Sequence, residues 1–229
     1  MSTTPSPSPA PPDSSEADGA RAGLLAGAGA YLLWGVLPLY FLLLEPAGPL
    51  EIVSVRVVFA LLFCLALLAV ARGWRRLGRV LADRRTMLLM LLAAALIFVN
   101  WLVYVIAATT GHVVEASLGY FINPIVTVLL GVAVLRERLR ATQWVAVAVA
   151  VAAVLVLAVG YGSVPWLSLA LAGSFGLYGL VKKAVGPRVD AVSGLTVETL
   201  WLTPLALAIV AVIASSGRLT LWSEGPAHF

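Results

Sequence analysis

Residues Val113–Leu135 read VVEASLGYFINPIVTVLLGVAVL, and this stretch decides the class of the fold. It is long enough to cross the hydrocarbon core of a bilayer as a helix, which takes about 20 residues. Its apolar residues are continuous and lack the strict alternation of a membrane-spanning strand. Glu115, Gly119 and Asn123 recur every fourth position and therefore share one helix face. The stretch predicts a transmembrane helix with one polar side.

The composition of the whole chain is that of a membrane protein. Of the 229 residues, 61% are hydrophobic and 11% are charged, whereas a soluble domain carries about 25% charged residues. The net charge of +4 comes from short basic clusters between apolar runs, so membrane orientation explains it better than nucleic-acid binding does. We therefore expect the lipid bilayer, and no nucleic acid, as the main partner of the chain.

Side-chain sets that would support a metal, a cofactor or catalysis do not assemble in the sequence. Cys64 is the single cysteine, and His112 and His228 have no ligand partners nearby, so we expect no metal site. No Gly-rich phosphate-binding loop occurs, which excludes an ATP-driven pump contained in this chain. The apolar runs hold no Ser/His pair and no paired aspartates. We predict neither an enzyme nor a bound cofactor.

Seven apolar runs approach or reach the length of a membrane-spanning helix. They cover residues 22–44, 52–71, 87–108, 113–135, 144–160, 165–181 and 193–214. We therefore predict an all-α integral membrane protein with about seven transmembrane helices. The Pro/Ser-rich segment 1–20 cannot bury a core, and we expect it to be a disordered cytoplasmic tail.

Basic residues gather on one side of the predicted spans. Of the 15 Lys and Arg residues, Arg56 falls within a span and Arg218 on the sparsely charged side, and the other thirteen lie on the side of the N-terminus. Cytoplasmic segments of membrane proteins carry an excess of Lys and Arg. The asymmetry predicts a multi-pass protein of the cell membrane with its N-terminus in the cytoplasm.

Three charged residues within the predicted spans, Arg56, Glu115 and Glu198, are candidates for binding a substrate or a proton. A charge at the centre of a membrane helix costs about 2.5–3.5 kcal/mol on insertion scales, so each such residue is expected to have a structural or functional role. Arg56 and Glu115 lie at a similar depth and could pair. All three are close enough to a membrane surface to extend to the headgroups instead, and this alternative stays open.

Further candidates are polar, aromatic or helix-distorting residues within the spans. Asn123 continues the polar face of the fourth span, and Gly119 leaves room there for a ligand or for a close neighbouring helix. The remaining binding candidates are Trp34, Asn100, Tyr104, Tyr178 and Trp201. Helix irregularities are expected at Gly35, Pro38, Gly119, Pro124 and Pro204. Packing between helices is the alternative role for all of these residues.

Two landmarks recur along the chain at almost the same distance. Trp34-Gly35 in the first span and Phe175-Gly176 in the sixth each form an aromatic–glycine step, 141 residues apart. The span that follows carries one charge in each case, Arg56 or Glu198, and these are 142 residues apart. Because the two copies lie five spans apart, the second must be inverted in the membrane, as in many secondary transporters.

One run, EASLGYFINP at residues 115–124, is specific enough to suggest a family. Together with LRERL at 135–139 and QW at 143–144, it resembles the RarD group of EamA-type transporters, in the drug/metabolite transporter superfamily. Weaker matching pieces are Trp34-Gly35, Asn100-Trp101, GLYGLVK at 176–182 and VETLW at 197–201. The resemblance, which runs over residues 23–214, implies ten helices in two inverted five-helix repeats around a central cavity, and the activity of a secondary carrier.

The resemblance also implies a division of this chain. Residues 22–160 would form the first five-helix repeat, residues 165–214 the first two helices of the inverted second repeat, and residues 215–229 a short external end. Because the family pattern continues with three more helices, we expect a truncated product or a fragment. Self-association of several chains to complete the bundle is the competing expectation. Glu137 belongs to the repeat signature, and a salt bridge at the inner surface is its simplest role.

We predict a secondary transporter that moves a small metabolite or drug-like molecule across the bacterial inner membrane, with proton flow as a candidate driving force. Glu115 or Glu198 would take up the proton, and Arg56 would pair with the charge or anchor the substrate. The alternative is a seven-helix membrane or assembly protein without transport activity.

Overall fold

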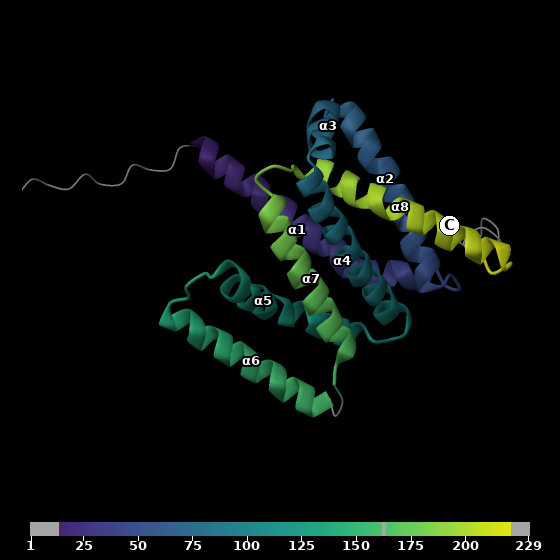
Figure 1. Cartoon of the computed structure of the whole chain (residues 1–229). Coiled ribbons are helices and arrows are strands. Elements are labelled where there is room, and N and C mark those ends of the chain that lie inside the picture. The colour runs from purple at the N-terminus through teal and green to yellow at the C-terminus, as the bar shows by residue number, and fades with distance from the viewer. Residues whose placement is uncertain (1–13, 162–163, 221–229) are drawn as a thin grey trace, which may run out of the picture. The chain divides into compact units, whose positions relative to one another are not determined.

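The computed structural model describes residues 14–161 and 164–220 as helices joined by short connections (Figure 1). The helices of this part are α1 (Ser14–Leu43), α2 (Pro49–Val70), α3 (Trp74–Ala82), α4 (Arg84–Thr109), α5 (Val113–Leu135), α6 (Ala141–Tyr161), α7 (Trp166–Val185) and α8 (Ala191–Ser215). No strand occurs among the described residues. The prediction of an all-α protein is confirmed.

Six helices of the described residues are long and apolar enough to cross a membrane, namely α1, α2, α4, α5, α6 and α8. The sequence predicts about seven spans, and the difference lies in α7. This helix covers most of the predicted run 165–181, but its Ser, Gly and Lys residues make it less apolar. α7 packs against both α4 and α5. Small and polar residues are typical of such helix–helix contacts in membranes, which explains the lower apolarity of α7.

The basic segment between the second and third predicted spans contains a short helix, α3, that the apolar runs do not predict. Leu77 and Val80 are buried on it, whereas Arg75, Arg76 and Arg79 are exposed. Two buried apolar positions in nine residues are too few to register as a span. Their spacing of three places them on one face of the helix, so α3 is amphipathic.

α1 begins at Ser14, earlier than the predicted first span at residue 22. The helix thus takes in residues 14–20 of the segment for which the sequence predicts a disordered tail. Residues 1–13, and residues 221–229 of the predicted external end, lie outside the described residues.

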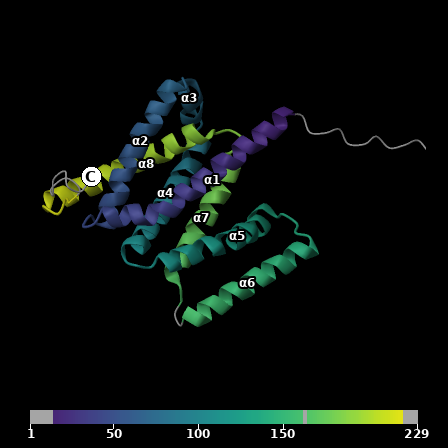
Figure 2. The same cartoon turned by 180° about the vertical axis from the view of Figure 1, so that it is seen from behind.

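The chain divides into two units between Tyr40 and Phe41. In the second unit α2 packs along α8, α5 packs along α7, and α4 lies against both α7 and α8 (Figures 1 and 2). α6 contacts this unit mainly through α5. α4 and α7 are therefore the helices through which the others of this unit are connected.

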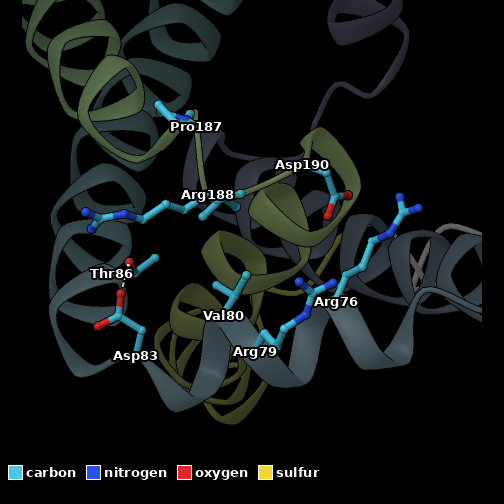
Figure 3. Close-up of a pocket in the computed structure, with 10 residues that line it drawn as sticks. Arg76, Arg79, Val80, Asp83, Thr86, Pro187, Arg188 and Asp190 are labelled. Carbon is cyan, nitrogen blue, oxygen red and sulfur yellow. Dashed lines mark hydrogen bonds between the residues drawn. The ribbon is translucent and has the colours of Figure 1, made fainter.

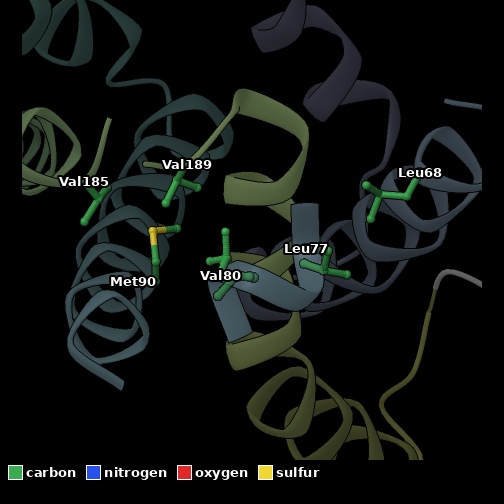
Figure 4. Close-up of a cluster of buried hydrophobic side chains, with 7 residues drawn as sticks. Leu68, Leu77, Val80, Met90, Val185 and Val189 are labelled. Carbon is green, nitrogen blue, oxygen red and sulfur yellow. The ribbon is translucent and has the colours of Figure 1, made fainter. Parts of the chain in front are cut away.

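A cluster of apolar side chains joins five helices at one end of the second unit (Figure 4). Its buried members are Leu68, Leu77, Val80, Met90, Val185, Val189 and Val197. They come from the end of α2, from α3, from the start of α4, from the end of α7 and the connection after it, and from the start of α8. The cluster holds the apolar face of α3 against the bundle and leaves the arginines of α3 on the outside.

Two glycines allow α5 and α7 to approach each other closely. A Cβ atom on Gly119 would lie 2.9 Å from the backbone oxygen of Ser168, and one on Gly176 would lie 2.7 Å from Cγ1 of Val126. Neither glycine could carry a side chain without a shift of its neighbour. Of the two roles that the sequence leaves open for Gly119, the structure shows the close neighbouring helix, and that helix is α7.

Candidate functional site

Glu198 is an acidic side chain held inside the bundle, with only 1% of its surface exposed. α8, which carries it, begins where the carboxylate of Asp190 accepts a hydrogen bond from the backbone N–H of Ser193 at 3.1 Å. Lys182 Nζ lies 2.9 Å from Glu198 Oε1, and the Tyr178 hydroxyl donates to Oε2 at 3.2 Å. Glu198, Lys182 and Tyr178 together form what we call the acid site.

The geometry of α7 and α8 brings the acid site together. Tyr178 and Lys182 are four residues apart on α7 and therefore share the face that meets α8. The Lys182 side chain is 30% exposed, so the cation lies between the buried carboxylate and the surface. Gly194, one turn before Glu198, leaves space for it, because a Cβ there would lie 2.9 Å from Lys182 Nζ. Removing one partner of a buried ion pair is strongly destabilising, so loss of Lys182 would leave the Glu198 carboxylate buried without a cation.

Asn100 connects α4 to α7 in the interior. Its side chain is 2% exposed, and its amide nitrogen donates to the backbone oxygen of Leu171 and to the hydroxyl of Ser174, both at 3.2 Å. A buried amide without such partners would be unfavourable. Asn100 therefore fixes the packing of α4 against α7, one helical turn before Tyr178 on α7.

Five aromatic rings form a continuous line through the second unit, which we call the aromatic line. Its members in spatial order are Phe41, Tyr104, Tyr120, Phe175 and Tyr178, with ring centroids 6.1, 5.9, 6.3 and 5.8 Å apart. The first three contacts are edge-to-face, the arrangement that the charge distribution of aromatic rings favours. Because Tyr178 belongs to both sets, the aromatic line ends at the acid site.

Arg56 on α2 places its guanidinium carbon 4.5 Å from the ring centroid of Trp101 on α4. A cation over a tryptophan face gains about 0.5–2 kcal/mol, with the larger values in desolvated sites. Trp101 packs in turn against a cluster that contains Val57, Ala94 and Leu202. The side chain of Arg56 is thus held at the interface of α2 and α4.

Glu115 contacts the start of α7. Its carboxylate accepts a hydrogen bond from the backbone N–H of Leu167 at 3.0 Å, and its backbone oxygen accepts one from the hydroxyl of Ser168. A carboxylate at the N-terminus of a helix satisfies a free N–H group and favours the positive end of the helix dipole. Glu115 and Gly119, which share a face, therefore both meet α7.

The other predicted site residues are not gathered at the acid site. Asn123 is half-buried and accepts a 3.4 Å hydrogen bond from Thr127 on its own helix. Trp201 is 38% exposed although Glu198, three residues earlier, is buried. Helices α5 and α8 continue through Pro124 and Pro204.

Three predicted residues, Trp34, Gly35 and Pro38, belong to the N-terminal unit. α1 continues through Pro38, as the other two proline-containing helices continue through theirs. The ring of Trp34 lies edge-on to Tyr31 with centroids 6.1 Å apart. Residues three apart share one face of a helix, so this contact lies along α1 itself.

Two buried or paired charges were not predicted as site residues. Lys182 was assigned to an inner connection, although the spacing of Tyr178, Lys182 and the charge at Glu198 was visible in the sequence. Glu51 is 2% exposed and accepts hydrogen bonds from the backbone N–H and the hydroxyl of Thr220, each at 3.0 Å. No pattern links Glu51 to Thr220, because only the fold brings residues 169 positions apart together.

Glu137 forms an ion pair with Lys183, at the end of α7. The expected role in a salt bridge is confirmed, but its partner comes from another helix and not from the neighbouring arginines. Both side chains are well exposed, at 60% for Lys183 and 48% for Glu137, and exposed pairs contribute only about 0–1 kcal/mol. The two neighbouring lysines of α7 thus have different environments, since Lys182 pairs with a buried carboxylate.

The chemistry available at the acid site is exchange of a proton or of an ionic partner. A carboxylate can bind a proton or a cation, and the phenol and the ammonium group can donate hydrogen bonds. Among the described residues, no three His, Cys, Asp or Glu side chains come together as a group that could hold a metal ion. Cys64, the free cysteine, is buried within α2.

Comparisons with known proteins give a consistent result. The sequence model of the EamA-like transporter family matches residues 21–159. A protein named "Protein RarD" from Streptomyces exfoliatus is 48% identical over 210 residues, which are 91% of this chain and 65% of that protein. The "Protein RarD" of Escherichia coli strain K12 is 39% identical over 196 residues, 86% of this chain and 66% of that protein.

A protein of Pseudomonas aeruginosa named as an uncharacterized transporter is 43% identical over 209 residues, 89% of this chain and 68% of that protein. The chain thus spans about two thirds of the length of the curated relatives that it matches. No solved structure matches the chain.

Proposed function

Since this chain belongs to the EamA-like transporter family and is of its RarD type, we propose that it carries the coupling charge of a secondary transporter. The protein would move a small metabolite or drug-like molecule across the bacterial inner membrane. Its apolar helices make it a multi-pass membrane protein. The family and the names of its relatives indicate a transporter and not an enzyme.

The acid site is the observation that supports this proposal most directly. Charged residues within membrane helices are rare and typically mark a substrate or ion pathway. An ion pair that served only stability could be replaced by apolar residues with little loss. The carboxylate of Glu198 has one cationic neighbour within 4.0 Å in the described residues, Lys182. Protonation of Glu198 would therefore remove the attraction that holds Lys182 in place.

We infer a coupling step from this arrangement. In the ionised state Glu198 keeps Lys182 and the Tyr178 hydroxyl close to α8. A proton that binds Glu198 neutralises the carboxylate, and the Lys182 side chain, which is already 30% exposed, becomes free to move toward the surface. Because the aromatic line ends at Tyr178, the movement of Lys182 would alter the contacts of a substrate bound against those rings.

Other candidate residues have supporting roles in the proposal. Arg56, held over Trp101, is the candidate anchor for an anionic group of the substrate. Asn100 positions α7, and Glu115 fixes its N-terminus. Asn123, Tyr104, Trp34 and Trp201 remain candidates for contact with the substrate.

We also propose that residues 22–160 form one repeat and residues 165–214 the start of a second, inverted one, with the N-terminus in the cytoplasm. The second helix of each repeat would then be α2 and α8, which carry the charges Arg56 and Glu198 at matching positions, and α2 also carries the buried Glu51. These two helices pack along each other. Contact between equivalent helices is what a two-fold axis between the repeats would produce.

Reconstitution tests the proposal. A thermal-shift screen of metabolites and drug-like compounds on the purified protein selects binders, and each binder is then offered to proteoliposomes that carry a pH gradient and a trapped pH-sensitive dye. We expect at least one binder to accumulate against its gradient and to dissipate the pH gradient. Binders that never cross the membrane, under either gradient, would contradict the proposal and favour a membrane protein without transport activity.

A further inference from the structure

A pocket of about 500 Å³ opens beside the apolar cluster, between α3, the start of α4 and the connection from α7 to α8 (Figure 3). Its charged lining residues are Arg76, Arg79 and Arg188 together with Asp83 and Asp190. Val80 and Val189 belong both to the lining and to the apolar cluster. The pocket therefore combines charged walls with an apolar side.

The two carboxylates that line this pocket already accept hydrogen bonds from the first turns of helices. Asp83 accepts hydrogen bonds from the Thr86 hydroxyl and from the backbone N–H of Arg85, the latter at 3.1 Å. Asp190 accepts a bond from the backbone N–H of Ser193 at 3.1 Å. Each carboxylate thus caps the helix that follows it, α4 or α8.

The arginines of this pocket are exposed and form no close ion pair with a described residue, although Arg188 acts electrostatically on Asp83 and Arg76 on Asp190. Within the described residues the ion pairs are Lys182–Glu198 and Lys183–Glu137, so Arg76, Arg79 and Arg188 take part in none. All three are exposed. Figure 3 shows Arg76 and Arg79 on neighbouring turns of α3, whereas the Arg188 side chain extends in the other direction, toward Thr86 and Asp83. A guanidinium group matches a phosphate with two parallel hydrogen bonds, and this geometry makes arginine a preferred phosphate ligand.

The pocket lies where the ends of four helices meet. α2 ends at Val70, α4 begins at Arg84, α7 ends at Val185 and α8 begins at Ala191, so four helix ends meet around it. α3, which forms one wall, has a basic outer face and a buried apolar face. Trp74 at its start is 49% exposed. Exposed tryptophan and a basic amphipathic helix are both typical of the membrane–water interface.

We propose that this pocket binds the phosphate of an anionic phospholipid, such as phosphatidylglycerol or cardiolipin, through Arg76 and Arg79 of α3, with Arg188 adding positive charge on the side of Thr86 and Asp83. The phosphate would meet the guanidinium groups, and the apolar lining at Val80 and Val189 would meet the upper part of the lipid. A basic pocket between helix ends is a recognised form of lipid-headgroup site. Such a lipid would fix α3 to the connection between α7 and α8, and so to the two helices of the acid site. A soluble phosphate shares the chemistry of the headgroup but has no acyl chains.

The test measures lipid retention by native mass spectrometry. The purified protein is reconstituted in phosphatidylcholine nanodiscs with increasing cardiolipin and then released into detergent. The pocket variant is Arg76→Gln/Arg79→Gln, and the control is Arg84→Gln/Arg85→Gln, which removes the same charge from exposed positions outside the lining. We expect the pocket variant to bind cardiolipin about tenfold or more weakly, from the loss of charged hydrogen bonds, and the control to change less than twofold.

Three outcomes would overturn the proposal. Equal losses in the two double variants would mean that general surface charge attracts the lipid. Displacement of cardiolipin by soluble glycerol 3-phosphate at equal concentration would identify a site for a free anion. Unchanged binding in the pocket variant would exclude the arginines of α3. If that variant fails to fold by circular dichroism and gel filtration, Arg188→Gln, in the connection from α7 to α8, tests the charge of the pocket without a change in α3.

Discussion

At the scale of single residues, the central feature is a carboxylate that is almost completely buried and has one cation beside it. Glu198 is 1% exposed, and Lys182 Nζ lies 2.9 Å away. The Tyr178 hydroxyl adds a second donor at 3.2 Å. The free energy of such a pair is a balance between lost hydration and mutual attraction, so the loss of either charge must have a measurable effect.

Lys182→Met is expected to lower the free energy of unfolding by about 1–3 kcal/mol, because Glu198 then remains buried without its cation. The partial exposure of Lys182 keeps the effect toward the low end of the range for buried pairs. The double variant Lys182→Met/Glu198→Gln should recover part of the loss. Thermal unfolding in detergent, arranged as a double-mutant cycle, measures the coupling. Additive effects of the two substitutions would contradict the proposed dependence of one charge on the other.

Asp83 provides a second prediction at this scale, and it concerns pH. The hydrogen bond from the Thr86 hydroxyl, with those from the backbone of Arg85 and Thr86, lowers the pKa of the Asp83 carboxyl. A lowered pKa in the folded state means that the carboxylate stabilises the protein above its unfolded pKa of about 3.9. This stabilisation is lost as the pH falls through the folded value.

The melting temperature of Asp83→Ala should therefore lie below that of the wild type at neutral pH. The gap should narrow as the pH falls below about 4, where the wild-type carboxyl takes up its proton. Thermal unfolding followed by tryptophan fluorescence between pH 3 and 8 provides the comparison. A gap that is constant over this range would show that charge at Asp83 does not support the start of α4.

At the scale of secondary structure, α7 is the element on which the site depends. It contacts both α4 and α5, and it contributes Tyr178 and Lys182 to the acid site. Its close approach to α5 requires glycine at Gly119 on α5 and at Gly176 on α7 itself. The lower apolarity of α7 is thus a consequence of its central position, since most of its neighbours are other helices.

Gly119→Ala is expected to destabilise the protein by about 1–3 kcal/mol, the usual result of overpacking. The added Cβ would lie 2.9 Å from the backbone oxygen of Ser168. A backbone atom cannot relieve this contact by a change of rotamer, as a side chain can. Gly179→Ala is the matched control, because no atom lies within 4 Å of the added Cβ. Denaturation in detergent compares the two. Equal stability of both variants would mean that α5 and α7 are not in close contact at Gly119.

At the scale of the whole molecule, the all-α membrane fold could be predicted from the length and continuity of the apolar runs. α3 could not, because a short amphipathic helix gains its stability from the cluster around Met90 and Val185 and not from its own sequence pattern. The sequence predicts α7 as a lipid-facing span. Its contacts with α4 and α5 could not be predicted, because they depend on the packing of segments that are distant in the sequence.

In the candidate site, too, residues with a local sequence signal could be predicted and contacts between distant residues could not. Glu198 and Tyr178 stood out because charges and phenols are unusual in apolar helices. The environment of Glu115 at the start of α7 and the contact of Glu51 with Thr220 join residues 52 and 169 positions apart. Such pairs have no local signal. Lys182 counts as an orientation signal in the sequence, because its pairing with Glu198 across the bundle has no local signal.

The proposed orientation of the molecule can be tested in intact cells. Cys64 is buried, so a Cys64→Ala background carries single cysteines introduced as Arg75→Cys on α3 or His112→Cys between α4 and α5. We expect a membrane-impermeant maleimide to label the cysteine at position 112 in intact cells and the one at position 75 only after permeabilisation, because the basic side should be cytoplasmic. The reverse pattern would place the N-terminus outside.

The most direct test of the central claim is proton-coupled uptake by Glu198→Gln in proteoliposomes, with a substrate identified by thermal shift. Glu137→Gln serves as the control, because it removes an acid from the exposed pair with Lys183 and leaves the acid site intact. We predict that Glu198→Gln binds the substrate but no longer accumulates it in response to a pH gradient, while the control behaves as the wild type does. Accumulation by Glu198→Gln at the wild-type rate, with the same proton flux, would contradict the assignment of Glu198 as the coupling carboxylate.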